Sequence, residues 1–198
     1  MSIRIIAINE KDGPDLLKFE IDNRSFFEKS CLARGDEYYE ENNFKKILKE
    51  LIKEQEQGIH YMYLIKNDND EIVGRINLVD VIRGSMNKAE LGYRIAEKHQ
   101  GKGYGKKAIE LVLGEALNIH KLHRIEAGSA IENIASQKIL ESSGFRKVGI
   151  YNKYIYVNGQ WNDSVIYEIL LSKIIVKDEY YYAKEICRDY GMACTCYL

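Results

Sequence analysis

The sequence is short of several features that would place it in a particular class. Its 198 residues contain a single proline, Pro14, and their formal charges sum to only −1. No apolar run approaches the length that a membrane-spanning helix needs, and the first residues, MSIRIIAINEKDG, have no signal-peptide core. A net charge this small gives no overall field that would attract nucleic acid or an anionic membrane. We therefore expect a soluble, cytoplasmic protein with no nucleic-acid or membrane partner.

Cysteine and histidine are also few, with four of each. Cys31 stands alone, and the other cysteines, Cys187, Cys194 and Cys196, lie near the C-terminus with a spacing typical of neither a zinc site nor a disulfide framework. Cys31 is expected to be a small buried side chain. The histidines fall where surface or boundary residues are expected, at His60, His99, His120 and His123. The sequence therefore predicts no metal site and favours a reducing compartment.

Hydrophobic residues make up 45% of the chain and charged residues 30%, enough for a sizeable core with a polar surface. Apolar residues at 44, 47, 48, 51 and 52 follow the one-face pattern of an amphipathic helix. Asn158 and Gly159 form a favoured two-residue turn between the arms of a final hairpin. The other expected elements are a strand at 3–8, a helix at about 14–21, an antiparallel meander of strands at 60–66, 71–82 and 89–96, a helix ending near 119, a strand at 123–130, a helix at 133–144 and the hairpin at 145–171.

This order of elements predicts a mixed α/β fold, with helices around a sheet that contains an antiparallel meander. We expect one domain over residues 1–172. Residues 173–198 form a tail rich in tyrosine and cysteine, with a short helix around 178–190 that packs on the domain or on a partner. The pattern is compatible with a monomer or a homodimer.

A glycine-rich loop lies between a predicted strand and a predicted helix. Residues 100–105 read Gln-Gly-Lys-Gly-Tyr-Gly, and Lys106 and Lys107 follow them. A helix N-terminus offers unpaired N–H groups and a positive dipole end, which suit a phosphate group. A Walker loop is excluded because Gly105 is not followed by Lys-Ser or Lys-Thr, and a Rossmann loop would need a parallel unit. An ordinary flexible loop is the alternative.

The pattern Gln100-x-x-Gly103-x-Gly105 resembles the acetyl-CoA pyrophosphate loop of the GNAT N-acetyltransferases. The segment IENIASQKILESSGF, residues 131–145, is similar to a second motif of that family, and the resemblance spans about residues 3–171. It implies the GNAT fold, a mostly antiparallel central sheet flanked by helices, and acetyl-CoA as the cofactor. It also implies cofactor contacts from Ile95, Asn133 and the loop residues Gln100, Gly101, Lys102, Gly103, Tyr104 and Gly105.

The resemblance further implies direct attack of an amine on the thioester, without a nucleophilic cysteine. Strand alternation places Glu90, Gly92 and Arg94 on one face of their strand. Glu90 is our candidate general base, because a carboxylate near a dry thioester site would have a raised pKa. The alternative is an exposed carboxylate paired with Arg94 or with a neighbouring lysine. Ser136 matches the serine that is thought to protonate the departing thiolate, and Tyr167 is a weaker candidate for that role.

For the acceptor, the hairpin at 156–167 and residues 23–30 resemble bacterial ribosomal-protein N-terminal acetyltransferases. This implies a protein α-amino group as acceptor, with Phe27 lining the acceptor groove or serving as a core aromatic. Ile155 stands where that branch can have a glutamate base, which weakens the transfer. A polyamine acetyltransferase is an alternative, and a non-catalytic acyl-CoA-binding module is another. An acidic run could attract a polycation or form a solvated helix face: Asp36, Glu37, Glu40 and Glu41.

Overall fold

The computed structural model describes residues 2–29, 33–157 and 159–171. The predictions made for Cys31, for Asn158 at the hairpin tip, and for the tail at 173–198 lie outside these residues.

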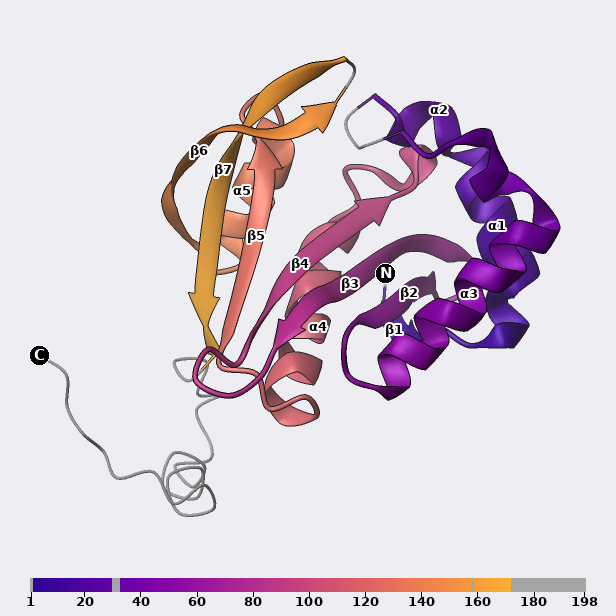
Figure 1. Cartoon of the computed structure of the whole chain (residues 1–198), viewed down its shortest axis with the longest axis horizontal. Coiled ribbons are helices and arrows are strands. Elements are labelled where there is room, and N and C mark those ends of the chain that lie inside the picture. Colours follow the sequence, from indigo (N-terminus) through magenta and orange to yellow (C-terminus); the bar gives the residue numbers. More distant parts are fainter. Residues whose placement is uncertain (1, 30–32, 158, 172–198) are drawn as a thin grey trace, which may run out of the picture.

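The centre of the molecule is one seven-stranded sheet with the strand order β1-β2-β3-β4-β5-β7-β6 (Figure 1). Neighbouring strands are antiparallel except for β4 and β5, which are parallel. The predicted meander is confirmed as β2, β3 and β4. The strands are β1 (Ile3–Ala7), β2 (Tyr61–Asn67), β3 (Ile72–Ile82), β4 (Lys88–Ile95), β5 (Arg124–Ala130), β6 (Arg146–Val157) and β7 (Gln160–Leu170).

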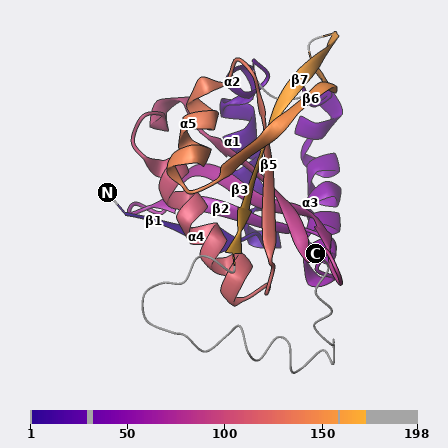
Figure 2. The same ribbon diagram turned by 90° about the vertical axis from the view of Figure 1, so that its left-hand side faces the viewer.

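Helices cover the two faces of this sheet in two groups. Helices α4 and α5 lie on one face, and α1 and α3 lie on the other (Figure 2). The five α-helices are α1 (Gly13–Asp22), α2 (Arg24–Phe27), α3 (Glu41–Glu56), α4 (Tyr104–Asn118) and α5 (Ile134–Ser142). Short 3-10 turns are η1 (Glu10–Asp12), η2 (Asp36–Tyr39) and η3 (Glu97–His99). In the part of the chain that the structure describes, no helix is long and apolar enough to cross a membrane.

Two hydrophobic clusters, one on each face of the sheet, hold these layers together. On β2, Tyr63 and Ile65 pack into the cluster that contains the buried side of α4, while Met62 and Leu64 pack into the cluster beneath α1 and α3. This is the alternation that a strand covered on both faces requires. The predicted amphipathic helix is confirmed as α3, which buries Phe44 and Leu48.

The sheet divides between β4 and β5. These strands pair only where Lys88–Glu90 meet Arg124–Glu126, and beyond that point they diverge (Figure 1). Strand β5 keeps its pairing with β7 along its whole length. The backbones of β4 and β5 therefore form a V, and the candidate site is built around this divergence, called the opening below.

The outer strand β6 contains an irregularity that the sequence did not predict. Its pairing with β7 shifts between Tyr151 and Ile155, and Lys153 takes a left-handed backbone conformation with φ of 49°. The N–H of Lys153 donates to Asp163 Oδ1 at 2.7 Å, which holds the bulge. A bulge re-aims the side chains beside it, and here the neighbour is Tyr154.

Candidate active site

The backbone of the glycine loop adopts a left-handed conformation at two positions, and both are occupied by glycine. Gly101 and Gly103 have φ values of 73° and 77°, in the left-handed region that other residues avoid. A Cβ built on either glycine would meet no atom within 4 Å, so the outer side of the loop is open. Gly103 is the N-cap residue of α4, and no side chain of the described residues caps this end of the helix. The loop therefore presents backbone N–H groups to an open surface, which fits a diphosphate.

Gly105 and Tyr104 serve packing as well. A Cβ on Gly105 would lie 3.3 Å from Tyr93 Cε2 and 3.4 Å from Ile139 Cδ1, so its lack of a side chain brings α4 close to β4 and α5. Gly105 thus has a packing role in addition to the cofactor contact that the resemblance implies. The ring of Tyr104 is buried in the core, so Tyr104 can offer the loop only its backbone.

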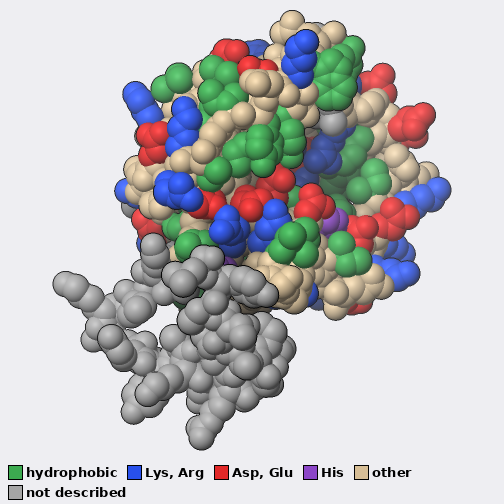
Figure 3. Space-filling view, turned by 60° about the vertical axis from the view of Figure 1, so that its left-hand side comes forward, with side chains coloured by type: hydrophobic (Ala, Val, Ile, Leu, Met, Phe, Trp, Pro, Cys, Tyr) green, Lys and Arg blue, Asp and Glu red, His purple; other side chains and the backbone are tan. Residues whose placement is uncertain are grey.

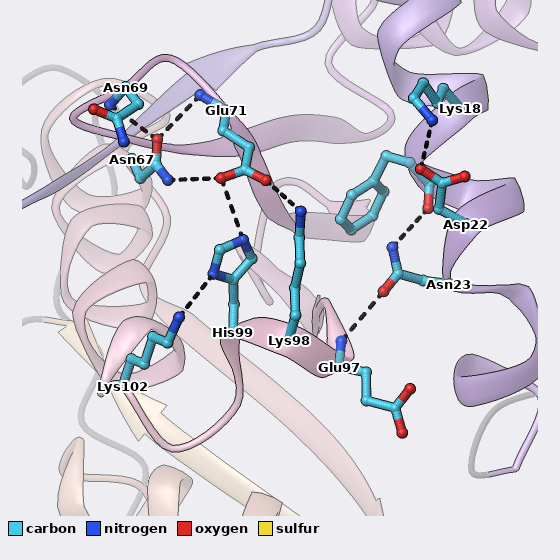
Figure 4. A network of polar contacts seen from close by, with 11 residues as sticks. Lys18, Asp22, Asn23, Asn67, Asn69, Glu71, Glu97, Lys98, His99 and Lys102 are labelled. Atoms are coloured by element: carbon cyan, nitrogen blue, oxygen red, sulfur yellow. Dashed lines mark hydrogen bonds and ion pairs between the residues drawn. The ribbon is translucent and has the colours of Figure 1, made fainter.

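A network of polar contacts holds the loop from behind (Figure 4). Lys102 Nζ lies 3.3 Å from His99 Nδ1, and His99 Nε2 lies 3.5 Å from Glu71 Oε2. Gln100 donates from Nε2 to the carbonyl oxygen of Ile95 at 2.7 Å, which joins the loop to the end of β4. The expectation that His99 is a surface or boundary residue is wrong, since it is only 8% exposed. His99 is buried because it lies between Lys102 of the loop and Glu71.

The edge of β4 that faces the opening has backbone groups available for an extended ligand. Ala96 donates its N–H to Val73 on β3, and peptide groups alternate in direction along a strand. The N–H groups of Tyr93 and Ile95 and the C=O groups of Leu91 and Tyr93 therefore point away from β3, while the C=O group of Ile95 already accepts from Gln100. Strand β5 does not pair with these residues. This edge suits the amide-containing arm of coenzyme A.

Ser136 lies at the start of α5, on the face of the sheet that α4 and α5 cover. The side chain of Asn133 accepts a hydrogen bond from the N–H of Ser136 at 3.1 Å and so caps the helix. Tyr93 on β4 donates from its hydroxyl to Ser136 Oγ at 3.2 Å, and burial raises the pKa of Tyr93. Tyr167 is outside this Tyr93–Ser136 pair, because it is fully buried and donates to Glu141 Oε1 at 3.1 Å. Sequence reasoning missed Tyr93.

Glu90 projects from the opposite face of β4 and is half-buried. A Cβ on Gly128 of β5 would lie 3.9 Å from Glu90 Oε1, so the carboxylate reaches across the narrow end of the opening. Burial raises the pKa of Glu90, and the charges of Asp80 and Glu126 add to this effect against that of Lys88.

The alternative interpretation of Glu90, an exposed carboxylate paired with Arg94 or with a lysine, is wrong. Arg94 is bonded to Glu20, and Lys88 donates to Glu126 Oε2 at 2.6 Å. Among the described residues, no cation forms an ion pair with Glu90. A half-buried carboxylate without a paired cation is what a general base at this position requires.

The final hairpin approaches this carboxylate. The charge of Glu90, together with burial, raises the pKa of Tyr154. Glu90 is also in register with Glu126 on β5, and Glu126 with Glu168 on β7. Figure 3 shows acidic side chains gathered with lysine and arginine side chains on this face of the molecule. A short local sequence pattern could not have predicted that Tyr154 belongs to the site. Nor could it have predicted that Glu90, Glu126 and Glu168 lie in register on three strands.

Phe27 is 5% exposed and packs against Phe19 and Phe26, with ring centroids 5.8 and 5.9 Å away. This burial supports the core interpretation, and a contact between Phe27 and the acceptor stays a prediction. The acidic run is partly paired, since Asp36 bonds to Arg24 and Glu41 to Lys45.

Comparison with known proteins identifies the family. The model of the acetyltransferase (GNAT) domain family matches residues 3–146. A probable N-acetyltransferase, YjcK of Bacillus subtilis (strain 168), is 34% identical over 170 residues, which are 85% of this chain and 94% of that protein. The [ribosomal protein uS5]-alanine N-acetyltransferase of Escherichia coli (strain K12) is 29% identical over 160 residues, 80% of this chain and 82% of that protein.

Solved structures have the same fold. The ribosomal-protein-S5-alanine acetyltransferase of Vibrio fischeri superposes with a TM-score of 0.83 at 22% identity, over 87% of this chain and 95% of that one. The spermidine N-acetyltransferase of Vibrio cholerae, in complex with CoA and spermine, gives a TM-score of 0.74 at 21% identity, over 86% and 96%. With its open sheet, its uncapped glycine loop and a family match over most of its length, the chain belongs to the GNAT family of acetyltransferases.

Proposed function

We propose that this acetyltransferase transfers the acetyl group of acetyl-CoA to the α-amino group of a protein or peptide. The observation that supports transfer most directly is the position of Glu90. Its half-buried carboxylate crosses the narrow end of the β4–β5 opening, and the Tyr93–Ser136 hydrogen bond lies on the other face of β4. A base for the amine and a donor for the leaving group thus flank one opening.

The residues around the opening fit acetyl-CoA. The N–H groups at Gly101–Gly105 would hold the pyrophosphate at the open side of the loop. The outward backbone groups of β4 at Leu91, Tyr93 and Ile95 would bond to the pantetheine arm, as an added strand does. Asn133 would keep α5 in position beside that arm through its cap on Ser136. Bound acetyl-CoA supplies a thioester whose acetyl group the neutral amine accepts, with release of a thiolate.

Glu90 would remove the proton from the ammonium form of the acceptor before or during attack. The burial that raises its pKa brings that pKa closer to the operating pH, which makes proton removal more efficient. An α-amino group with a pKa of about 8 needs modest help at neutral pH, whereas a lysine amine at about 10.4 needs far more. Ser136 would donate its hydroxyl proton to the thiolate, the hydroxyl of Tyr93 would replace it, and Tyr93 would regain its proton from solvent to complete the cycle.

The acceptor class follows from similarity together with charge. The matches in sequence include enzymes named for alanine in ribosomal protein uS5. The acidic run, which a polyamine would need as a free surface, has Asp36 and Glu41 engaged with Arg24 and Lys45. A peptide α-amino group is therefore the acceptor we propose, and a polyamine is the second candidate.

The test is acetyl-CoA turnover, measured as thiol release, with peptides of varied N-terminal sequence, with spermidine and spermine, and with aminoglycosides. Turnover on peptides well above that on polyamines is expected. Preference for polyamines would overturn the acceptor assignment. Tight binding of acetyl-CoA with no turnover on any of these amines would instead favour a non-catalytic acyl-CoA-binding protein.

A further inference from the structure

An arginine cluster lies on the same face of the sheet as Glu90. It consists of Arg34, Arg75 on β3 and Arg94 on β4, around the fully buried carboxylate of Glu20 on α1. Arg75 bonds to Glu20 Oε1 at 2.5 Å, and Arg94 bonds to Glu20 Oε2 at 3.2 Å. Arg34 lies over the ring of Tyr38, 4.1 Å from its centroid.

Positive charge is in excess in this cluster, because three guanidinium groups share one carboxylate. Arg75 and Arg94 occupy both oxygens of Glu20, so within the described residues Arg34 contacts the ring of Tyr38 and no carboxylate. The nearby acids Glu28 and Asp36 are bonded to Arg24. Burial and the charges of Arg94 and Arg75 lower the pKa of Arg34, although Tyr38 and Glu20 act in the opposite direction.

One donor in the cluster has no partner. The side chain of Arg75 is 4% exposed, and within the described part of the chain its Nε has no hydrogen-bond partner. A buried donor without a partner is costly. An anion supplied by a ligand beside Arg34 and Arg94 would offset the excess of positive charge in the cluster.

An open strip connects the arginine cluster with Glu90. On β4, Glu90, Gly92 and Arg94 share one face, and a Cβ on Gly92 would meet no atom within 4 Å. Asn77 on β3 is paired with Gly92, and its buried Oδ1 finds no partner among the described residues. Glu90 and Arg94 are four residues apart, or about 13 Å along the strand.

We propose that the acceptor carries a carboxylate, which binds to Arg34 and Arg94 when its amine lies at Glu90. This inference rests on the proposed function and specifies its acceptor as a peptide with an acidic residue close behind the N-terminus. One end of the strip attracts an ammonium group through Glu90 and Asp80, since Glu126 is paired with Lys88, and the other end attracts an anion. An extended peptide advances about 3.3 Å per residue, so the strip is about four residues long. The side chains of the glutamate and of the arginine reach toward each other along part of this length, which brings the acidic residue to the second to fourth position. A polyamine would place a second cation against the arginines.

The test compares hexapeptides that share an N-terminal alanine and carry one glutamate at position 2, 3 or 4 with peptides that carry glutamine there. We expect kcat/KM for the best glutamate peptide to exceed that of its glutamine partner by about tenfold or more, the effect of one charge-assisted hydrogen bond. Added salt should reduce this ratio. Arg34→Gln and Arg94→Gln should remove it, while the KM for acetyl-CoA stays unchanged.

Arg4→Gln is the matched control, since Arg4 lies in the edge strand β1, two strands away from β3, where it bonds to Asp70. It should leave the ratio intact. Equal rates on glutamate and glutamine peptides would overturn the carboxylate proposal and leave peptide acetylation standing. If no peptide is acetylated, the proposed function fails, and calorimetry with the same peptides and the enzyme–CoA complex decides the inference. Tighter binding of the glutamate peptide would support it, and equal binding would overturn it.

Discussion

At the scale of single residues, Glu90 differs from the acids around it because, among the described residues, no cation pairs with it. The cations on its own strand are engaged, Arg94 with Glu20 and Lys88 with Glu126. Its remaining neighbours include the acids Asp80 and Glu126, which raise its pKa together with burial. A carboxylate in these surroundings gains from accepting a proton, and an ammonium group in the opening is the donor that the reaction provides.

Glu90→Gln should therefore lower turnover, and the loss should be greatest at low pH. With the base present, the rate is level between the pKa of Glu90 and that of the amine, near 8. Without the base, the rate follows the neutral fraction of the amine and rises about tenfold per pH unit up to that value. A pH profile of kcat/KM from pH 5.5 to 9 measures this. A variant profile parallel to that of the wild type over this range would exclude the base role.

The stability of this variant is an internal control. The folded-state pKa of Glu90 is raised, so its contribution to stability is present at low pH and is lost as pH rises through that pKa. Glu90→Gln should then unfold at a temperature no lower than the wild type at pH 8. A loss of activity together with a large loss of stability would indicate a structural role instead.

The hydrogen bond between Tyr93 and Ser136 allows a second test at this scale. If the two hydroxyls pass one proton to the thiolate, Ser136→Ala and Tyr93→Phe should each lower kcat by about 100-fold. The double variant should be hardly worse than either single one, because both act on the same step. Single-turnover rates with acetyl-CoA measure this. Additive losses, or a change only in the KM for acetyl-CoA, would contradict a shared proton path.

Sequence reasoning placed Glu90 and Ser136 through strand alternation and motif spacing, but not their partners. Alternation also shows that Tyr93 faces away from Glu90, and nothing local shows that α5 brings Ser136 within 3.2 Å of it. The arginine cluster was missed for the same reason. Glu20 and Arg94 are 74 positions apart in the chain, and only the packing of α1 on the sheet joins them.

At the scale of elements, the glycine loop is the segment whose shape determines cofactor binding. Gly103→Ala adds a Cβ that meets nothing in the protein itself, but it strains a backbone with φ of 77°. We expect a stability loss of about 1 kcal/mol from the left-handed conformation and a rise of about tenfold or more in the KM for acetyl-CoA. Thermal unfolding and initial rates at varied acetyl-CoA measure the two effects.

Gly84→Ala separates backbone strain from ligand contact. Gly84 lies in the turn between β3 and β4 with φ of 75°, and a Cβ there also meets no atom within 4 Å. The two variants should lose similar stability, and only Gly103→Ala should weaken acetyl-CoA. If both raise the KM equally, the loop is not the pyrophosphate site.

Most of these elements could be predicted because their hydrophobic periods are regular. Strands β2, β3 and β4 lie within one or two residues of their predicted ranges, and α3 follows its apolar stripe. The bulge in β6 could not be predicted, since it depends on Asp163 of the neighbouring strand accepting from Lys153. The divergence of β4 from β5 is likewise a property of the pairing, and neither strand shows it alone.

At the scale of the whole molecule, the net charge of −1 conceals two opposite fields on one face. Acidic groups gather around Glu90 and arginines around Glu20, so the acceptor side is dipolar although the protein is nearly neutral. The composition predicts no polyanionic partner, and it does not reveal that acidic and basic groups are separated on this face. The folded structure must bear the free-energy cost of holding these charges apart, and that cost is concentrated at Glu20.

Glu20→Gln should destabilise the whole domain. The carboxylate is fully buried, and although burial opposes ionisation, Arg75 and Arg94 hold the pKa of Glu20 below its usual value. Its loss leaves Arg75 buried without a counter-charge, which costs about 3–5 kcal/mol and should lower Tm by roughly 6–20 °C. Glu41→Gln, which removes an exposed acid on α3, should stay close to the wild type.

The pH dependence of the difference in Tm between the wild type and Glu20→Gln is the more discriminating measurement. A carboxylate with a lowered folded-state pKa stabilises the protein above its unfolded pKa of about 4.3, and this stability is lost as pH falls through the folded value. The gap in Tm between wild type and Glu20→Gln should therefore be full at pH 6 to 8 and should narrow below pH 4. A gap that is the same at pH 3.5 and pH 7 would mean that the variant disturbs packing, and that Glu20 is not the counter-charge that holds α1 to the arginines of β3 and β4.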